Sequence, residues 1–328
     1  MRDTDRTLIV APYVGEFGWE LMTWQGRVRR RIAHERFRSV AVCAQPDRRP
    51  LYGATGPETS VRFCPIGNAD LPGEPNQDHR INDDGRPLPA DELRRIAVAL
   101  AADACARCGL DTGRATFMTP DYHGTICPTT RAHQWFDDLR DCGPITTDVL
   151  LVPRHRRLAG ERNRSAAWWD DLAARLRQGG LTVETYRPPL GTAIRQLSRT
   201  RLAIGASTGG LHLAGLCRCP HYVWGSGSDV RWTPMGVTNR QRYETLWNPF
   251  GTPCIYDESG WQPPVDHVVE QTRRALNRIG LRPGSNGRHW TLKPKWRVKR
   301  QLARLFDSDP RTGVCPWRVR TFVRERLV

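Results

Sequence analysis

Short apolar runs alternate with stretches of helical periodicity in the first half of the chain. The runs that favour strands are residues 7–14, 39–44 and 60–66, and the helical patterns cover residues 18–32 and 90–110. Residues 67–88 are rich in Pro, Gly, Asn and Asp and are expected to form a loop, whereas residues 111–144 show no regular pattern. Strands and helices that alternate in this way are typical of an α/β fold with a parallel sheet.

A second series of strands and helices begins near residue 148. Its expected strands are residues 148–153, 181–186, 201–205 and 221–224, and its expected helices are residues 166–178, 192–199, 210–217 and 265–279. Ser165 is placed to cap the first of these helices, with Trp168, Leu172 and Leu176 on one face. The sequence therefore predicts two Rossmann-like domains, residues 1–146 and 147–280, followed by a tail of residues 281–328.

The charge balance indicates an anionic partner. Lys and Arg number 50 against 34 Asp and Glu, which gives a formal net charge of +16. Such an excess favours nucleic acid, an anionic membrane surface or an acidic substrate. No apolar run approaches the ~18 residues of a membrane-spanning helix, and the N-terminus lacks a signal-peptide core. We therefore expect a cytoplasmic protein.

Ten cysteines allow several interpretations. Cys105 and Cys108 form a C-x-x-C pattern, and Cys217 and Cys219 form C-x-C. A zinc site built from these four is one interpretation, but no second C-x-x-C or H-x-H stands at zinc-finger spacing. We favour reduced cysteines that act as small buried hydrophobic residues, and the number of disulfides stays open.

The segment 201–225 is the most informative stretch for chemistry. An expected strand runs into a turn and then a helix, where backbone N–H groups and hydroxyls are suited to binding a phosphate. The candidate anion ligands in this turn are Ser207, Thr208, Gly209, Gly210 and His212. A basic loop follows the expected strand 148–153, at the end of the strand where open α/β sheets bind ligands. The basic residues of this loop are Arg154, His155, Arg156, Arg157, Arg162 and Arg164, and the candidate phosphate ligands among them are Arg154, Arg162 and Arg164.

Several motifs follow one another in the order and spacing of a known family. They are LLVPRHRR with the helix that follows it, RLAIGASTGGLHLAGL, CPHYVWG and RWTPMG. Residues 148–234 thus resemble the C-terminal domain of the ADP-heptose:lipopolysaccharide heptosyltransferases, which are two-domain glycosyltransferases of the GT-B fold. The resemblance implies two Rossmann-like domains facing a cleft and a nucleotide-diphosphate sugar as donor. Ser207 stands where the family has Asp, so the donor nucleotide stays open.

The family resemblance extends to the N-terminal loop. In that family the first strand ends in a Gly-Asp loop whose carboxylate acts as base beside the acceptor, and the matching segment here runs from Gly15 to Glu20. Glu16 is the implied catalytic base and Glu20 the second candidate, since glycosyl transfer needs a group that takes the hydroxyl proton. Alternatively, one of these carboxylates only stabilises the start of the helix that follows. The acceptor-side candidates are Gly15, Gly18, Arg27 and Arg30.

Two further segments complete the expected partners. Residues 239–257 are interpreted as a lip over the donor pocket, with Arg242 and Tyr243 as possible contacts; the aromatic residues suit a core equally well. In residues 288–328, twelve Lys and Arg stand against three acidic residues and are interleaved with aromatic residues. Such a basic amphipathic segment favours peripheral contact with an anionic membrane, binding to nucleic acid, or packing on its own domain.

The acceptor is left open by the sequence. A cell-envelope glycan or glycolipid is the first expectation, and hydroxymethylated pyrimidine in DNA, as in some phage enzymes, is the alternative. A non-catalytic nucleotide- or nucleic-acid-binding protein on a GT-B scaffold is a third interpretation. We expect no cofactor beyond the nucleotide sugar as co-substrate, no metal-ligating residues, and a metal-independent enzyme.

Overall fold

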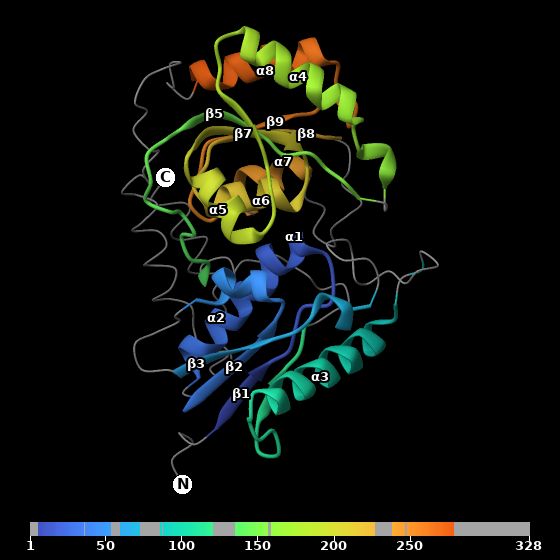
Figure 1. The fold of residues 1–328 in the computed structure, drawn as a ribbon, viewed down its shortest axis with the longest axis vertical. Coiled ribbons are helices and arrows are strands. Elements are labelled where there is room, and N and C mark those ends of the chain that lie inside the picture. The colour runs from blue at the N-terminus through green and yellow to red at the C-terminus, as the bar shows by residue number, and fades with distance from the viewer. Residues whose placement is uncertain are drawn as a thin grey trace.

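The computed structural model describes residues 6–35, 37–53, 60–72, 86, 88–120, 135–156, 159–226, 238–246 and 248–278. These residues form two units, each built on a parallel sheet, and Figure 1 shows one unit above the other. The α/β fold with two Rossmann-like sheets expected from the sequence is therefore confirmed. The tail expected at residues 281–328 lies outside the described residues. None of the described helices is long and apolar enough to cross a membrane.

The first unit holds a four-stranded sheet in the order β3-β2-β1-β4, and every neighbouring pair is parallel. Its strands are β1 (Thr7–Val10), β2 (Ser39–Ala44), β3 (Ser60–Pro65) and β4 (Thr116–Met118). Its helices are α1 (Phe17–Trp19), the π-helix η2 (Glu20–Trp24), α2 (Gln25–His34), the short 3-10 helices η3 (Pro46–Tyr52) and η4 (Asn68–Asp70), and α3 (Ala90–Arg107). Parallel strands of this kind need crossover connections, and α2 and α3 lie in two of them.

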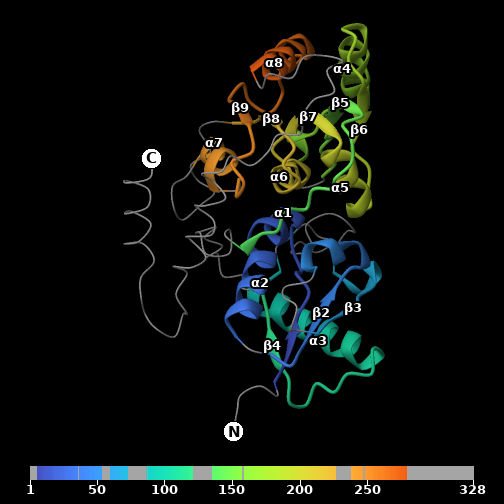
Figure 2. The same ribbon diagram turned by 90° about the vertical axis from the view of Figure 1, so that its left-hand side faces the viewer.

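The second unit holds a five-stranded sheet in the order β6-β5-β7-β8-β9, again all parallel. Its strands are β5 (Thr147–Leu151), β6 (Val183–Thr185), β7 (Thr200–Ala206), β8 (His221–Trp224) and β9 (Cys254–Asp257). Its helices are η6 (Gly160–Arg162), α4 (Ala166–Gln178), α5 (Leu190–Ser198), α6 (Gly209–Leu216), α7 (Asn239–Gln241), the π-helix η8 (Arg242–Leu246) and α8 (Val265–Arg278). Helices α4 and α8 cover the outer face of the sheet, and α5 and α6 lie between it and the first unit (Figures 1 and 2).

Two elements of the first unit differ from the prediction. The first strand ends at Val10 and not at residue 14. Pro12, two residues after Val10, has no N–H to donate to a neighbouring strand. The helix expected over residues 18–32 is interrupted by η2, in which the turns are wider. Side chains hydrogen-bond to backbone carbonyls in this segment. Thr23 Oγ1 donates to the Trp19 carbonyl, and Gln25 Nε2 donates to the Leu21 carbonyl.

Two short strands were missed by the sequence pattern. β4 lies within the stretch that showed no regular pattern, and its three residues pair with β1. β9 lies within residues 239–257, where we expected a lip, and it is the edge strand beside β8. Three or four residues are too few to show the alternation on which strand prediction depends. Part of the expected lip is therefore sheet.

The predicted start and end of α4 are confirmed. Ser165 Oγ accepts a hydrogen bond from the Trp168 backbone N–H at 3.2 Å, and the chain after the helix turns at Gly180 with a φ of 79°. The buried tryptophan of the helix is Trp169 and not Trp168, which is half-buried at the edge of the core. An aromatic side chain one position away from the predicted stripe fills the core against Trp224.

One apolar core runs through both units. It includes Leu8 and Val10 of the first sheet and Leu150 and Leu213 of the second unit. The segment before β5 contributes to it through Phe136, which is fully buried. The loops after β1 and after β7 are consequently brought close together.

Candidate functional site

The second sheet has its topological switch point between β5 and β7. From β5 the chain crosses to β6 on one side, and from β7 it crosses to β8 on the other. Open α/β sheets bind ligands outside the carboxyl ends of the two strands that flank such a point. A Cβ on Gly205 would lie 2.6 Å from the Val152 carbonyl oxygen, so only glycine lets the two strand ends approach this closely. The loops after β5 and β7 therefore form one surface.

The turn after β7 leads directly into the start of α6. Thr208 is the N-cap residue with extended backbone angles, and its carbonyl accepts from the backbone of Leu211 and His212. Gly209 and Gly210 supply the first helical N–H groups, which have no acceptor inside a helix. The Thr208 Oγ1 atom is buried and has no hydrogen-bond partner among the described residues. These groups together form a donor set suited to an anion.

Tyr243 supports this turn from behind. Its hydroxyl accepts from the Thr208 N–H at 3.1 Å and donates to Ser207 Oγ at 3.1 Å. Its ring stacks on the His212 imidazole with centroids 4.5 Å apart. The Tyr243 side chain is 1% exposed, so it is a core residue that fixes the turn and not an open contact of a lip.

His212 is neutral in this setting. It is 7% exposed, and burial lowers its pKa well below 6.5, with further lowering by the positive charge of the neighbouring Arg242. Arg242 is itself buried. The structure therefore places a hydrogen-bonding imidazole and a cation directly behind the start of α6.

A carboxylate of the first unit meets the basic loop of the second. Glu16 Oε1 accepts a hydrogen bond from Arg156 Nη1 at 2.5 Å, and the two side chains are 28% and 20% exposed. Glu16 follows β1 and Arg156 follows β5, so both come from carboxyl ends of central parallel strands. The sequence placed Arg156 in this basic loop but not among the phosphate ligands, because an arginine-rich loop does not show which guanidinium faces the other unit.

The three arginines predicted as phosphate ligands contact other groups of the second unit. Arg154 is buried, and its Nη1 donates to the Ala159 carbonyl and to Asn163 Oδ1, which holds the loop in shape. Burial and the positive charge of Arg156 lower the pKa of Arg154 to about 10. Arg162 and Arg164 lie over the rings of Trp261 and Trp168, at 4.3 and 4.5 Å from the ring centroids. Such stacking fixes the loop.

Glu20 lies in a different environment from Glu16. Its side chain is buried, and its two oxygens accept from Arg48 Nε at 3.1 Å and from the Tyr52 hydroxyl at 2.8 Å. Burial raises the pKa of Glu20, and the hydrogen bonds and charge of these neighbours oppose the rise. Arg48 also lies over the Phe17 ring at 4.3 Å. Glu20 thus anchors the segment that carries Glu16.

The acceptor-side candidates divide in the same way. Gly15 and Gly18 are buried at the contact between the units, whereas Arg27 and Arg30 are half-buried on α2. A Cβ on Gly18 would lie 3.4 Å from His212 Cδ2, and one on Gly209 would lie 3.0 Å from Phe17 Cδ1. Helix α1 therefore packs directly against the start of α6, as Figure 1 shows.

Comparisons with known proteins give matches only among solved structures. No family model matches the sequence, and no curated protein matches it. The E. coli heptosyltransferase WaaC with ADP is 11% identical with a TM-score of 0.41, over 82% of this chain and 99% of that one. The E. coli ADP-heptose lipopolysaccharide heptosyltransferase II is 13% identical with a TM-score of 0.43, over 84% and 99%. The spinosyn rhamnosyltransferase SpnG with thymidine diphosphate is 10% identical with a TM-score of 0.29, over 92% and 96%. At these identities the likeness concerns the fold alone.

Proposed function

We propose that the protein is a GT-B glycosyltransferase that moves a sugar from a nucleotide-diphosphate sugar to a hydroxyl of an anionic acceptor. The observation that carries the proposal is the meeting of Glu16 with Arg156 beside the start of α6. A carboxylate, a guanidinium and free helical N–H groups come together at the carboxyl ends of strands from both sheets. These are the groups that such a transfer needs.

In the proposed reaction the diphosphate lies at the start of α6. The N–H groups of Gly209 and Gly210 and the Thr208 hydroxyl bind its oxygens, with Ser207 and His212 in support and Arg242 behind them. Arg156 turns from Glu16 to the diphosphate, because a doubly charged group attracts a guanidinium more strongly than one carboxylate does. Glu16 is then released to act on the acceptor.

Glu16 serves as the general base. It takes the proton of the acceptor hydroxyl while the hydroxyl oxygen bonds to the anomeric carbon of the sugar. The bond between that carbon and the diphosphate breaks, and its electrons leave with the nucleotide diphosphate. Arg156 and the α6 N–H groups stabilise this charge as it develops. Since these groups supply the positive charge, we expect transfer without a divalent cation in the cleft, and brief EDTA treatment should leave turnover unchanged.

The acceptor is assigned by charge. The net charge of +16 favours an anionic molecule, and a cell-envelope glycan or glycolipid is the acceptor we propose. Peripheral contact with an anionic membrane would bring such an acceptor to the cleft. DNA with hydroxymethylated pyrimidines is the alternative acceptor. Binding of the protein to duplex DNA that weakens steeply with salt would favour this alternative.

A thermal-shift screen of the full chain tests the donor assignment. Nucleoside diphosphates and their sugars at about a hundred times Kd should add about 2.7 kcal/mol of stability, a shift of several degrees in Tm. Arg156→Ala should reduce the shift, whereas Arg175→Ala, an exposed arginine of α4, should keep it. No shift with any nucleotide, together with no release of nucleoside diphosphate from any sugar donor, would refute the proposal.

A further inference from the structure

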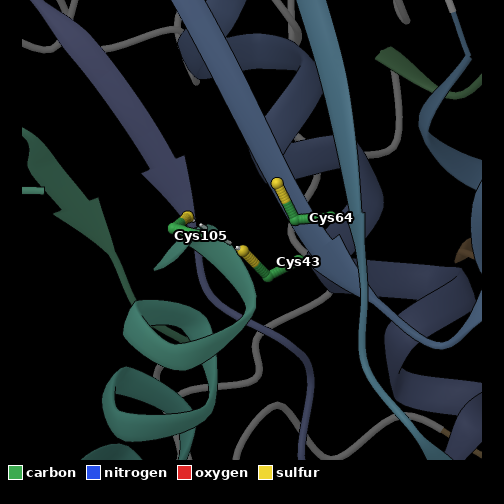
Figure 3. A group of neighbouring side chains, drawn as sticks. All are labelled: Cys43, Cys64 and Cys105. Atoms are coloured by element: carbon green, nitrogen blue, oxygen red, sulfur yellow. Dashed lines mark hydrogen bonds between the residues drawn. The ribbon is translucent and has the colours of Figure 1, made fainter. Parts of the chain in front are cut away.

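A cluster of cysteines lies in the first unit, apart from the residues of the proposed site. Cys43 and Cys64 stand opposite each other in the register of β2 and β3, so their side chains leave neighbouring parallel strands on the same face. Cys105 comes from the last turn of α3, and its sulfur lies 3.6 Å from the Cys43 sulfur. Figure 3 shows the three side chains approaching one another from two strands and a helix.

The three sulfur atoms are close enough to share one ion. All of them lie within 4.8 Å of one another, and all three residues are buried. A tetrahedral Zn²⁺ site with Zn–S bonds of about 2.3 Å places its sulfur atoms about 3.8 Å apart. In the part of the chain that the structure describes, no second group of His, Cys, Asp or Glu gathers in this way.

Cys108 lies beside the cluster. It follows Cys105 at C-x-x-C spacing, where residues three apart share one side of a helix end. Cys108 also packs against the apolar cluster that contains the other three cysteines. Two cysteines of a strand pair and one of the helix end thus converge, and Cys108 stands at the same helix end beside them.

We infer that Cys43, Cys64, Cys105 and Cys108 form a structural Zn²⁺ site. Each thiol loses its proton to solvent as its Zn–S bond forms. Four thiolates fill the tetrahedral coordination of the ion, so no position remains for water or substrate, and the role is structural. The sulfur atoms of Cys43, Cys64 and Cys105 lie within 4.8 Å of one another, which suits a single ion, and thiolate ligands select zinc over the hard cations Mg²⁺ and Ca²⁺.

The surroundings suit such a site. A zinc ion with four thiolates carries two net negative charges, and the cationic Arg62 stands on β3 two residues before Cys64. Arg107, which stands between the two cysteines of the C-x-x-C pattern, donates to the carbonyl of Pro65 next to Cys64. The ion would tie the ends of β2 and β3 to the end of α3. The segment after β2 carries Arg48, the partner of Glu20, so the zinc site would lie just before the residues that anchor the segment of Glu16.

Metal content of the full chain, purified under reducing conditions, tests the inference. We expect one zinc per chain by elemental analysis and native mass spectrometry. Cys43→Ser and Cys64→Ser should lose it. Cys219→Ser, a buried cysteine of the second unit, and Cys142→Ser, an exposed one, should keep it.

Further measurements on the unaltered chain test the inference even if the cysteine variants fail to fold. A mercurial reagent should release the zinc, and replacement by Co²⁺ should give the intense visible bands of tetrahedral thiolate coordination. Tm should fall on release and recover when Zn²⁺ is added back. A chain that carries no metal and takes up neither ion overturns the inference, and so does a Cys43–Cys105 disulfide in protein kept from air.

Discussion

Glu16 and Glu20 lie four residues apart, and substitution by Gln should reduce turnover at the first position and stability at the second. Glu16→Gln removes one side of an ion pair whose side chains are 28% and 20% exposed. Solvent-exposed pairs contribute about 0.2–1 kcal/mol, and this partly buried pair should lie at the upper end, so the free energy of unfolding should change by about 1 kcal/mol. Loss of a general base should reduce turnover by about 10²- to 10⁴-fold.

Glu20→Gln should act on stability. The side chains of Glu20 and Arg48 are 5% and 9% exposed, and removing one partner of a buried pair costs about 3–5 kcal/mol. Asp47 still accepts a hydrogen bond from Arg48 at 2.9 Å, so we expect a cost at the lower end of this range, about 3 kcal/mol. For a unit of this size the Tm should fall by roughly 6–12 °C.

The assay measures urea unfolding and sugar transfer on both variants. Transfer by Glu20→Gln is measured well below its Tm, where a folded variant should retain most of its turnover. Two results would refute the reasoning. One is full turnover by Glu16→Gln, and the other is a loss of stability in Glu16→Gln as large as that in Glu20→Gln.

Three further changes test other parts of the structure. Gly210→Ala puts a Cβ 2.7 Å from Val152 Cγ1 and should cost about 1–3 kcal/mol in urea unfolding, whereas Gly191→Ala, with its nearest neighbour at 3.9 Å, should not destabilise. Ser165→Ala removes the α4 cap and should cost about 1 kcal/mol in the same assay. Burial lowers the pKa of His221 from 6.5 to about 4, so the unfolded chain binds its proton first, and stability should fall by about 3 kcal/mol as pH drops from 6.5 to 4. His221→Phe should remove that share of the pH dependence, and an unchanged slope would contradict the assignment.

Sequence reasoning succeeded where a local signal extends over many residues. The strands β2 and β8 lie within the predicted ranges, because continuous apolar runs bounded by polar residues mark buried strands. The cap at Ser165 is likewise a local signal. Prediction from the sequence failed for β4 and β9. Their pairing with β1 and β8 depends on tertiary contacts, and three or four residues are too few to show a periodicity.

The candidate site shows the same limit. The turn from Ser207 to Gly210 was found because glycines and hydroxyls stand together in the sequence. Arg156 was assigned only to the basic loop as a whole, since the sequence does not show which of its guanidinium groups contacts the other unit. Arg154 turns inward to Asn163, and Arg164 lies over Trp168, while Arg156 reaches Glu16. The cysteine cluster was missed for a related reason, because Cys43 and Cys64 stand far from Cys105 in sequence and meet only through strand register.

The contact between α1 and α6 links donor binding to the position of the base. Phe17 and Gly18 lie against Gly209, so little space separates the first unit from the N–H groups that the proposal assigns to the diphosphate. Under the proposed mechanism, a diphosphate that binds there would displace α1 from Gly209 and, in the same movement, separate Glu16 from Arg156. Glu16 would then be released toward the acceptor only when the donor is present. The arrangement would therefore limit hydrolysis of the donor by water, because the base is held by Arg156 until the donor has taken that guanidinium.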